Sequence, residues 1–488
     1  MTELPKRVRG QSSEVPGECA PGTAPMRRAL VVAYHFPPST TVGANSCAQM
    51  VRYLPEYGWE PIVLSAPADE FARVEGDSVR SKRSGISGKV LRAASLPHPY
   101  GVHRRIRSWL RPKGRGGAPV DVRVTPAWRS SWPGRQLLAL LEMPDQHMGW
   151  WAPAVWKGMR AARSEGVDCV LSSAPMWTNH VVGLTLRRLT GLPLVVHYRD
   201  PWTQVRQWKA RSRFSDWTDR RLERAVIHAA DAVVCVTDRH RALLERLYPD
   251  VPSSRFSTIT NGYDEGEWRG IEPVSARDRA GRSAFVITYT GSLYQERSPF
   301  PLFRAIRRLA DSGSVRLEQM RIDLVGWCEE AEGRSVRAVA EELGLARCVQ
   351  VLPPVERAEA LRRLVDSDLL LLLAEDWTLQ VPAKTYEYLR AGPPVLALTQ
   401  DGALSDVLRK ASGTFIVAPT DLEGIERLVG TLFRKWAGGV PTERRDPQEV
   451  VMYERKGLAG RLAEVLGAVS SRRHRVADGA MTSRMAGR

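Results

Sequence analysis

The sequence predicts an α/β protein with two doubly wound domains, each built on a parallel sheet. Three observations support this class. Short apolar runs of the kind buried in parallel sheets, such as 29–34, alternate with amphipathic helical stretches. The alternation stops in a polar stretch at 266–283 and starts again at Phe285. The length of 488 residues suits two domains.

Both halves are predicted to repeat strand–helix units, and Gly58 ends the first helix. The strands of the first half are predicted at 29–34, 61–65, 168–172, 193–198, 232–237 and 256–260. Its helices are predicted at 45–57, 154–165, 177–190, 216–230 and 238–247. The strands of the second half are predicted at 285–290, 320–326, 348–352, 368–374, 394–399 and 414–417. Its helices are predicted at 301–311, 334–343, 356–365, 383–391, 403–410 and 421–435, with a final helix near 449–466.

These elements divide the chain into segments. A polar leader is predicted to be disordered, and a strongly basic insert interrupts the first domain. The last helix is expected to return to the first domain and to be followed by a frayed basic tail. The predicted boundaries are 1–27 for the leader, 28–270 for the N-terminal domain, 72–135 for the insert, 284–440 for the C-terminal domain, 445–467 for the returning helix and 470–488 for the tail.

The net charge of +17 is concentrated in the insert, which carries 15 Lys and Arg against three acids. Tryptophans are interleaved with these charges, a mixture that suits an anionic membrane surface or nucleic acid. The plain alternative is a solvated loop. The sequence shows no nucleic-acid-binding module, so we expect no nucleic-acid partner.

The composition also indicates the cellular compartment. The six cysteines are scattered without paired spacing, which argues against a disulfide framework or a zinc site and fits a reducing cytosol. No apolar run has the length of a signal peptide or a bilayer span. We therefore expect a cytoplasmic protein, either free or peripheral on the inner face of the plasma membrane.

The segment 381–398 is the most informative of the chain. It is predicted as a loop, a short helix, a glycine and a buried strand, with Lys384 and Glu387 three residues apart in the first helical turn. A helix start with a lysine suits a phosphate, and a carboxylate can accept hydrogen bonds from sugar hydroxyls. This combination is what a nucleotide diphosphate sugar requires.

Other polar loops follow the predicted strands, at the sheet edge where ligands of doubly wound folds bind. Gly43 follows the first strand, and Gly291 and Ser292 with Arg297 follow the first strand of the second half, where they can cradle a diphosphate. Asp200 lies in the loop His197-Tyr198-Arg199-Asp200-Pro201-Trp202, which brings a basic and an acidic side chain to the cleft. The alternative interpretation is a local ion pair that caps the following helix. His147 lies near Trp150 and Trp151, in either a sugar platform or a packed corner.

These motifs, in this order, resemble the retaining glycosyltransferases of the GT-B fold, group 1 (glycosyltransferase family 4). The similarity rests on Tyr-His-Phe-Pro-Pro at 34–38 with Gly43, Arg-Asp-Pro-Trp at 199–202, Asn-Gly-Tyr-Asp at 261–264, Thr-Gly-Ser-Leu at 290–293 and Pro-Ala-Lys-Thr-Tyr-Glu-Tyr-Leu at 382–389. It runs from about residue 29 to residue 466, apart from the insert. The resemblance implies two Rossmann-like domains facing across a cleft, with the C-terminal helix crossing back.

The resemblance also implies roles for the residues. Glu387 matches the glutamate that binds the ribose, Arg297 meets the donor diphosphate with Lys384 beside it, and Gly43 lets the diphosphate approach the backbone. Asp200 and His147 are the candidates for contact with the acceptor and for catalysis. The chain departs from the pattern at two positions, where Leu379 replaces an earlier glutamate and Asn45 replaces an arginine after the glycine. Backbone around 378–381 is then expected to contact the donor hexose.

The activity implied is transfer of a sugar from a nucleotide diphosphate sugar to an acceptor hydroxyl, with retention and without cofactor or metal. The acceptor would be a carbohydrate, a lipid-linked molecule or a small molecule, in polysaccharide or natural-product glycosylation. Three alternatives stay open: a nucleotide-sugar 2-epimerase on the same fold, a basic nucleic-acid-binding protein, and a non-catalytic scaffold that docks to membranes.

Overall fold

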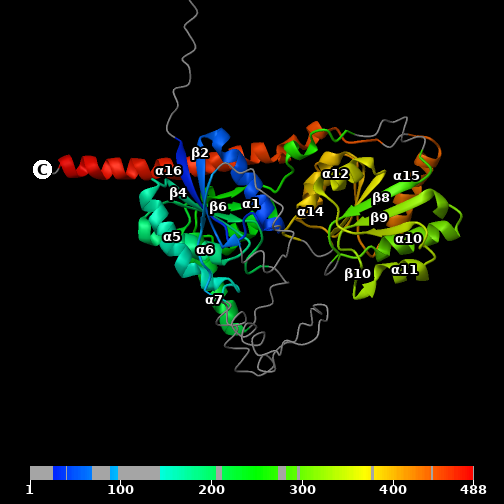
Figure 1. Ribbon diagram of the computed structural model, residues 1–488, viewed down its shortest axis with the longest axis horizontal. Coiled ribbons are helices and arrows are strands. Elements are labelled where there is room, and N and C mark those ends of the chain that lie inside the picture. Colours follow the sequence, from blue (N-terminus) through cyan, green and yellow to red (C-terminus); the bar gives the residue numbers. More distant parts are fainter. Residues whose placement is uncertain are drawn as a thin grey trace, which may run out of the picture.

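The computed structural model contains two α/β lobes, each with its own sheet (Figure 1). It describes residues 26–39, 41–68, 88–96, 143–204, 212–272, 282–293, 297–374, 378–440 and 443–486, with side chains in the last segment described up to residue 471. Every strand pair of the two large sheets is parallel. The predicted architecture of two parallel α/β domains is confirmed.

The N-terminal sheet has seven strands in the order β3-β2-β1-β4-β5-β6-β7. The strands are β1 (Arg27–Val32), β2 (Trp59–Ser65), β3 (Lys89–Arg92), β4 (Cys169–Ser173), β5 (Leu194–Tyr198), β6 (Ala232–Cys235) and β7 (Phe256–Thr258). The helices between them are α1 (Val42–Tyr53), α5 (Trp151–Ser164), α6 (Thr178–Thr190), α7 (Arg213–Ala229) and α8 (Asp238–Leu247), with short 3-10 turns η1 (Leu54–Tyr57) and η4 (Met148–Trp150).

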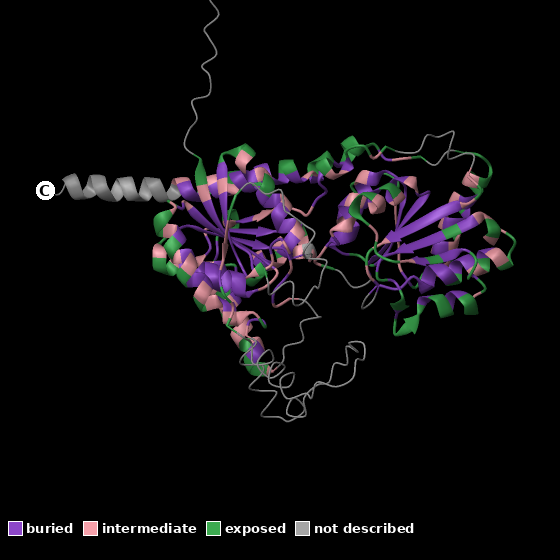
Figure 2. Ribbon diagram, in the orientation of Figure 1, coloured by how far each residue is buried: buried purple, intermediate pink, exposed green. Residues whose placement is uncertain are grey.

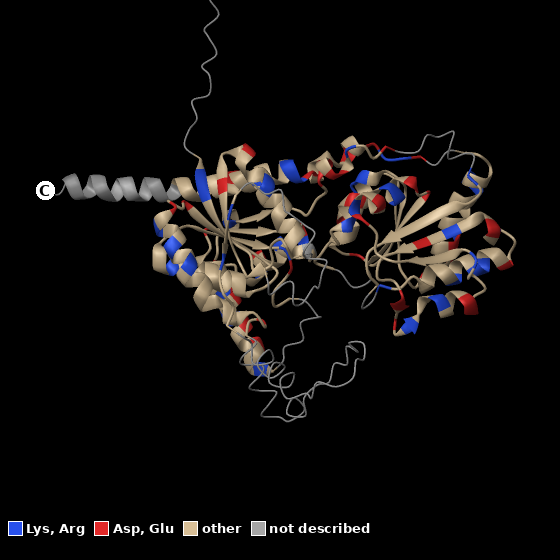
Figure 3. Ribbon diagram, in the orientation of Figure 1, with Lys and Arg blue, Asp and Glu red and all other residues tan. Residues whose placement is uncertain are grey.

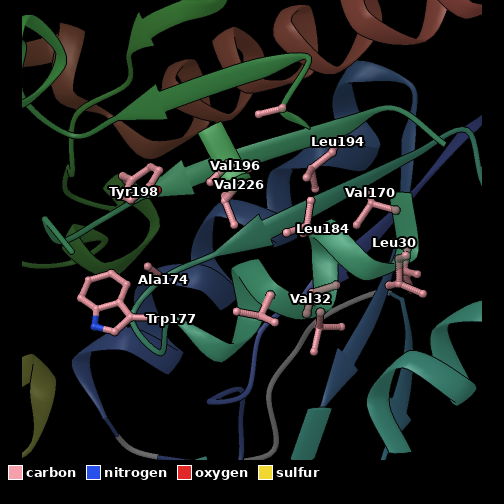
Figure 4. Packing of buried hydrophobic residues seen from close by; sticks show 14 of the residues in the cluster. Leu30, Val32, Val170, Ala174, Trp177, Leu184, Leu194, Val196, Tyr198 and Val226 are labelled. Atoms are coloured by element: carbon pink, nitrogen blue, oxygen red, sulfur yellow. The ribbon is translucent and has the colours of Figure 1, made fainter. Parts of the chain in front are cut away.

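The two faces of this sheet belong to different hydrophobic clusters because alternate side chains of a strand point in opposite directions. Leu30 and Val32 pack with α5, α6 and α7, and part of this cluster is seen in Figure 4. Ala29 and Val31 pack on the other face with α1 and the C-terminal helix. Figure 2 shows the strands of both lobes as the most continuously buried parts of the chain.

The C-terminal sheet has six strands in the order β12-β9-β8-β13-β14-β15. They are β8 (Phe285–Thr290), β9 (Met320–Val325), β12 (Val349–Leu352), β13 (Leu369–Ala374), β14 (Val395–Thr399) and β15 (Thr414–Val417). The helices are α10 (Phe300–Asp311), α11 (Val336–Glu342), α12 (Arg357–Asp366), α13 (Lys384–Ala391), α14 (Ala403–Leu408) and α15 (Leu422–Ala437), and β10 (Glu330–Ala331) pairs with β11 (Arg334–Ser335) in a small hairpin.

The chain returns to the N-terminal domain through η8 (Pro447–Tyr453) and α16 (Arg455–Ala486). The backbone N–H of Tyr263 donates to the carbonyl of Tyr453 at 3.1 Å, and the N–H of Arg455 donates to the carbonyl of Tyr263 at 2.9 Å. Leu458 and Leu462 are then buried in the cluster that contains α1. This is the crossing helix that the sequence predicts, and Figure 1 shows α16 running along the N-terminal lobe.

The structure corrects three sequence predictions. Strand β1 begins at Arg27, inside the predicted leader. The insert 72–135 contributes Lys89–Arg92 as edge strand β3, where the side chain of Arg92 donates to the carbonyls of Pro37 and Ala66 and so holds the loop after β1. Helix α16 continues to Ala486 in place of a frayed tail. The rest of the insert, and residues 1–25, lie outside the described residues.

Within the described ranges, no helix is both long enough and apolar enough to cross a bilayer. The five described cysteines are buried, and none of them forms a disulfide.

Gly262→Ala tests the crossing of the chain between the domains. An added Cβ would lie 2.0 Å from the carbonyl oxygen of Tyr453 and 2.7 Å from Cδ1 of Leu458, so backbone must move. We expect the free energy of unfolding to fall by about 2 kcal/mol, as measured by urea denaturation. The control is Gly457→Ala, where no atom lies within 4 Å and the helix should gain slightly. Equal stability of the two variants would contradict the contact.

Candidate active site

The ends of β8 and β9 are in close contact, and each strand is followed by a glycine. Gly291 follows β8 with φ +122°, and its N–H donates to the carbonyl of Val325 at 2.8 Å. Gly326 follows β9 with φ +127°, and a Cβ there would lie 2.2 Å from the carbonyl oxygen of Gly291. Neither position accommodates an ordinary side chain. The carboxyl edge of the sheet therefore presents backbone without side chains at these two positions.

Lys384 lies directly against the backbone at the end of β8. It begins α13, and its Nζ donates to the carbonyl of Thr290 at 2.6 Å and lies 3.8 Å from the centroid of the Tyr289 ring. A Cβ on Gly291 would lie 2.7 Å from the same Nζ. The structure therefore brings Gly291 and Lys384 together, as the sequence predicts.

Burial lowers the pKa of Lys384 well below its ordinary value, and the positive charge of Arg297 lowers it further. Cys328 and Glu387 act in the opposite direction. Arg297 is itself buried, at 7% exposure, in the loop after Ser292. An anion bound beside Lys384 and Arg297 would favour the protonated form of Lys384.

Glu387 lies one turn further along α13 and is held by Arg357, the first residue of α12. Nη1 and Nη2 of Arg357 donate to the two carboxylate oxygens of Glu387 at 3.0 and 2.7 Å. The Nε and Nη2 of Arg357 also donate to Glu267 at 2.9 and 2.6 Å. Burial acts to lower the pKa of Arg357, but Glu387 and Glu267 outweigh burial and raise it. Sequence reasoning did not find Arg357, although it follows a predicted strand at the same sheet edge.

This ion network reaches the other domain. Glu267 belongs to the turn η6 (Glu265–Trp268) between the domains, and its Oε1 accepts a hydrogen bond from Nε2 of Gln49 on α1 at 2.7 Å. Glu387 is thus connected through Arg357 and Glu267 to the N-terminal domain.

The loops predicted for the sugar and for the acceptor meet across the domain junction. The side-chain amide of Gln380 donates to Asp200, and Oγ1 of Thr237 donates to the carbonyl of Leu379 at 2.7 Å. Burial raises the pKa of Asp200, while Arg199 and Gln380 act to lower it. An open hollow of about 960 Å³ borders Thr378 and Leu379, with α8 on its other side. The backbone expected to replace the missing glutamate therefore lies between the two domains.

A buried carboxylate on α7 bonds the residues that come shortly after Asp200. Glu223 accepts hydrogen bonds from Thr203 at 2.6 Å, from Gln204 at 2.8 Å and from the hydroxyl of Tyr248 at 3.1 Å. Burial raises the pKa of Glu223. These bonds fix the loop that follows Asp200.

Gly43 lies in the first turn of α1, where its carbonyl accepts a hydrogen bond from Nη1 of Arg199 at 2.8 Å. Arg455 reaches the same helix, donating to Oγ of Ser46 at 3.2 Å. Burial lowers the pKa of Arg199, and it lowers that of Arg455 to about 10 with Arg199 contributing. Asn45 stands where the resemblance implies an arginine, and the positive charge beside α1 comes instead from Arg199 and Arg455.

His147 occupies a turn next to the loop after β1. Its ring lies 4.0 Å, between centroids, from that of Tyr34. Its backbone N–H donates to Asp145, which also caps α6 by accepting from the N–H of Thr178 at 2.9 Å. Trp150 is fully buried in the core, which makes it part of a packed corner, whereas His147 and Trp151 are half-buried. Contact of His147 with a sugar stays a prediction.

In the part of the chain that the structure describes, no three His, Cys, Asp or Glu side chains are grouped as metal ligands would be. The expectation of a reaction without metal stays a prediction.

Comparison with known structures identifies the fold. The chain is similar to sucrose-phosphate synthase from Thermosynechococcus elongatus (14% identity, TM-score 0.55, covering 94% of this chain and 100% of that one). It is also similar to HepE of Anabaena in complex with UDP (14% identity, TM-score 0.58, covering 91% and 100%). These likenesses show that the protein has the GT-B fold, as the sequence predicts.

Sequence comparison points to one family. Residues 120–267 match the model of Glycosyltransferase Family 4. The chain is 27% identical over 146 residues to alpha-maltose-1-phosphate synthase of Mycolicibacterium smegmatis, covering 28% of this chain and 36% of that protein. It is 26% identical over 214 residues to D-inositol 3-phosphate glycosyltransferase of Corynebacterium jeikeium, covering 39% and 47%. The chain thus spans less than half the length of these curated relatives.

Lys384→Met tests the ammonium group that lies against Thr290 and Tyr289. Because the pKa of Lys384 is lower in the folded protein than in the unfolded chain, the unfolded chain binds the extra proton below pH 10.5. The free energy of unfolding of the wild type should therefore rise with pH relative to the variant, by up to about 1.4 kcal/mol per pH unit. Urea denaturation in a series of buffers below pH 10.5 measures the difference. Parallel curves would contradict the assignment, and Lys410→Met provides an exposed lysine as control.

Proposed function

We propose that this protein is a glycosyltransferase that moves a sugar from a nucleotide diphosphate sugar to an acceptor hydroxyl. One observation carries the proposal: the half-buried Lys384 lies against the backbone of Gly291, close to Arg297 and one helical turn from Glu387. A diphosphate would neutralise the cations, and the ribose would lie within reach of the carboxylate. The GT-B fold and the family match over residues 120–267 support this proposal.

The proposed reaction uses the positive charges of Arg297 and Lys384. The bond between the anomeric carbon and the diphosphate breaks, and Arg297 and Lys384 stabilise the charge that develops on the leaving group. The acceptor oxygen forms the new bond on the face from which the diphosphate departs, so configuration is retained. The acceptor proton passes to the departing phosphate oxygen. Because the two side chains supply the positive charge, no metal is required by this scheme.

The N-terminal domain would hold the acceptor. Asp200 faces Gln380 across the domain junction, and His147 lies beside Tyr34 at the same carboxyl edge of the N-terminal sheet. Gly43 and the arginines beside α1 would face the diphosphate from the opposite side. We expect the acceptor to be a carbohydrate, a lipid-linked molecule or a small molecule, and the reaction to take place in the cytoplasm. UDP-sugars are the first donors to test, since HepE was solved with UDP.

Glu387→Ala should lower the rate of sugar transfer by about 100-fold, because two hydrogen bonds from ribose hydroxyls to a carboxylate are lost. The matched control is Glu267→Gln, which removes the charge of the other carboxylate bonded to Arg357. Circular dichroism melting should show both variants folded. Transfer from a panel of nucleotide sugars is measured by release of the nucleoside diphosphate in the presence of acceptors.

Equal loss of activity in the two variants would assign Glu387 to the ion network alone and contradict the ribose contact. The same assay without acceptor separates the alternatives. An epimerase would interconvert the nucleotide sugar with no acceptor present, and a non-catalytic scaffold would bind the donor without turnover.

A further inference from the structure

The N-terminal domain exposes large apolar side chains on one layer of helices. Helices α5, α6 and α7 cover the same face of the sheet, as their inner residues belong to one core cluster (Figure 1). On their outer side Trp156 of α5 is 60% exposed, Leu189 of α6 is 54% exposed, and Phe214 and Trp217 of α7 are 49% and 54% exposed. The rings of Phe214 and Trp217 stack with centroids 5.9 Å apart.

The same layer is strongly basic. The three helices contain nine Lys and Arg and only three acids, and all three acids lie on α7. One of these acids, Glu223, is fully buried and faces inward. Figure 3 shows lysines and arginines along these outer helices.

Carboxylates offset part of this charge. Arg220 pairs with Asp216 at 3.0 Å, Arg224 with Asp250 at 3.0 Å, and Arg187 with Asp231 at 2.6 Å. Arg160 and Arg221 instead lie over the rings of Trp156 and Trp217, at 5.0 and 5.1 Å from the centroids. On α5 and on α7, basic and aromatic side chains are therefore in direct contact on the outer side of the helix.

The fold does not require these outer side chains. The buried residues of the three helices, such as Ala154, Val182 and Val226, pack on the sheet and supply the core. Exposed rings together with arginines on the outer face of amphipathic helices are the pattern that partitions into the headgroup region of a bilayer. Each basic residue near an anionic surface adds to the affinity.

We propose that the outer face of α5, α6 and α7 binds the surface of an anionic lipid bilayer. Leu189 and Phe214 favour lipid over nucleic acid, because they have no polar group for a phosphate or a base edge and gain free energy at the acyl-chain boundary. Helix α7 is also joined to the loop of Asp200, since its inward-facing Glu223 bonds Thr203 and Gln204. An acceptor embedded in the bilayer would thereby reach the site.

Co-sedimentation with vesicles tests the surface, with no nucleotide sugar present. The full-length protein should bind vesicles of phosphatidylcholine with phosphatidylglycerol and not vesicles of phosphatidylcholine alone. Raising the salt from about 0.1 M to about 0.5 M should weaken the binding. The double variant Arg213→Glu/Arg221→Glu should bind at least about tenfold more weakly. The double variant Phe214→Ser/Trp217→Ser tests the apolar contribution and should also bind more weakly.

Matched controls lie on the C-terminal domain. Trp327→Ser removes a tryptophan that is 67% exposed, and Arg304→Glu reverses an exposed charge on α10. Both controls should bind vesicles like the wild type, and melting curves should show all variants folded. Wild-type binding by both α7 variants, or no vesicle binding by the wild type, would overturn the proposal. So would salt-sensitive binding to random double-stranded DNA with none to vesicles. Each of these results leaves the proposed sugar transfer standing, because that reaction is measured with soluble acceptors.

Discussion

The packing around one ammonium group determines the arrangement of the active site. Lys384 is held between the carbonyl of Thr290 and the ring of Tyr289, and it can lie there only because Gly291 has no side chain. Gly291 in turn requires glycine at 326, since the two strand ends touch. The parallel register of β8 and β9 brings these residues together at the carboxyl edge of the sheet. A site for an anion thus follows from backbone packing as much as from charge.

The parallel architecture could be predicted from sequence because its signals are local. Apolar runs, helical periodicity and glycine stops identify most strands within one or two residues, and the rule that ligands bind at carboxyl ends groups the loops correctly. Gly291 and Lys384 were predicted to share a site, and they are in contact. The crossing helix was also predicted, from its position at the end of the chain and from the family resemblance.

The features that the sequence did not predict depend on long-range contacts. Edge strand β3 is short and lies within a basic segment, so its apolar signal is weak, and only pairing with β2 defines it. The partners of Glu387 could not be predicted, because Arg357 and Glu267 are distant in sequence and meet only when the domains are packed. Trp150 is buried by Tyr34 and its neighbours, which no local pattern around 143–151 indicates.

The bonds of Arg357 have a thermodynamic consequence for the contact between the two lobes. A single guanidinium ties the carboxylate on α13 to Glu267 between the domains, and Glu267 is bonded to Gln49 on α1. A molecule that displaces Arg357 from Glu387 leaves that guanidinium with Glu267 as its carboxylate partner, so occupancy of Glu387 changes the ion network between the lobes. If binding at Glu387 alters the bond between Arg357 and Glu267, a change at the far end of the network, such as a substitution of Gln49, alters the affinity for the bound molecule in turn. Contact between the lobes and occupancy of Glu387 are then thermodynamically coupled.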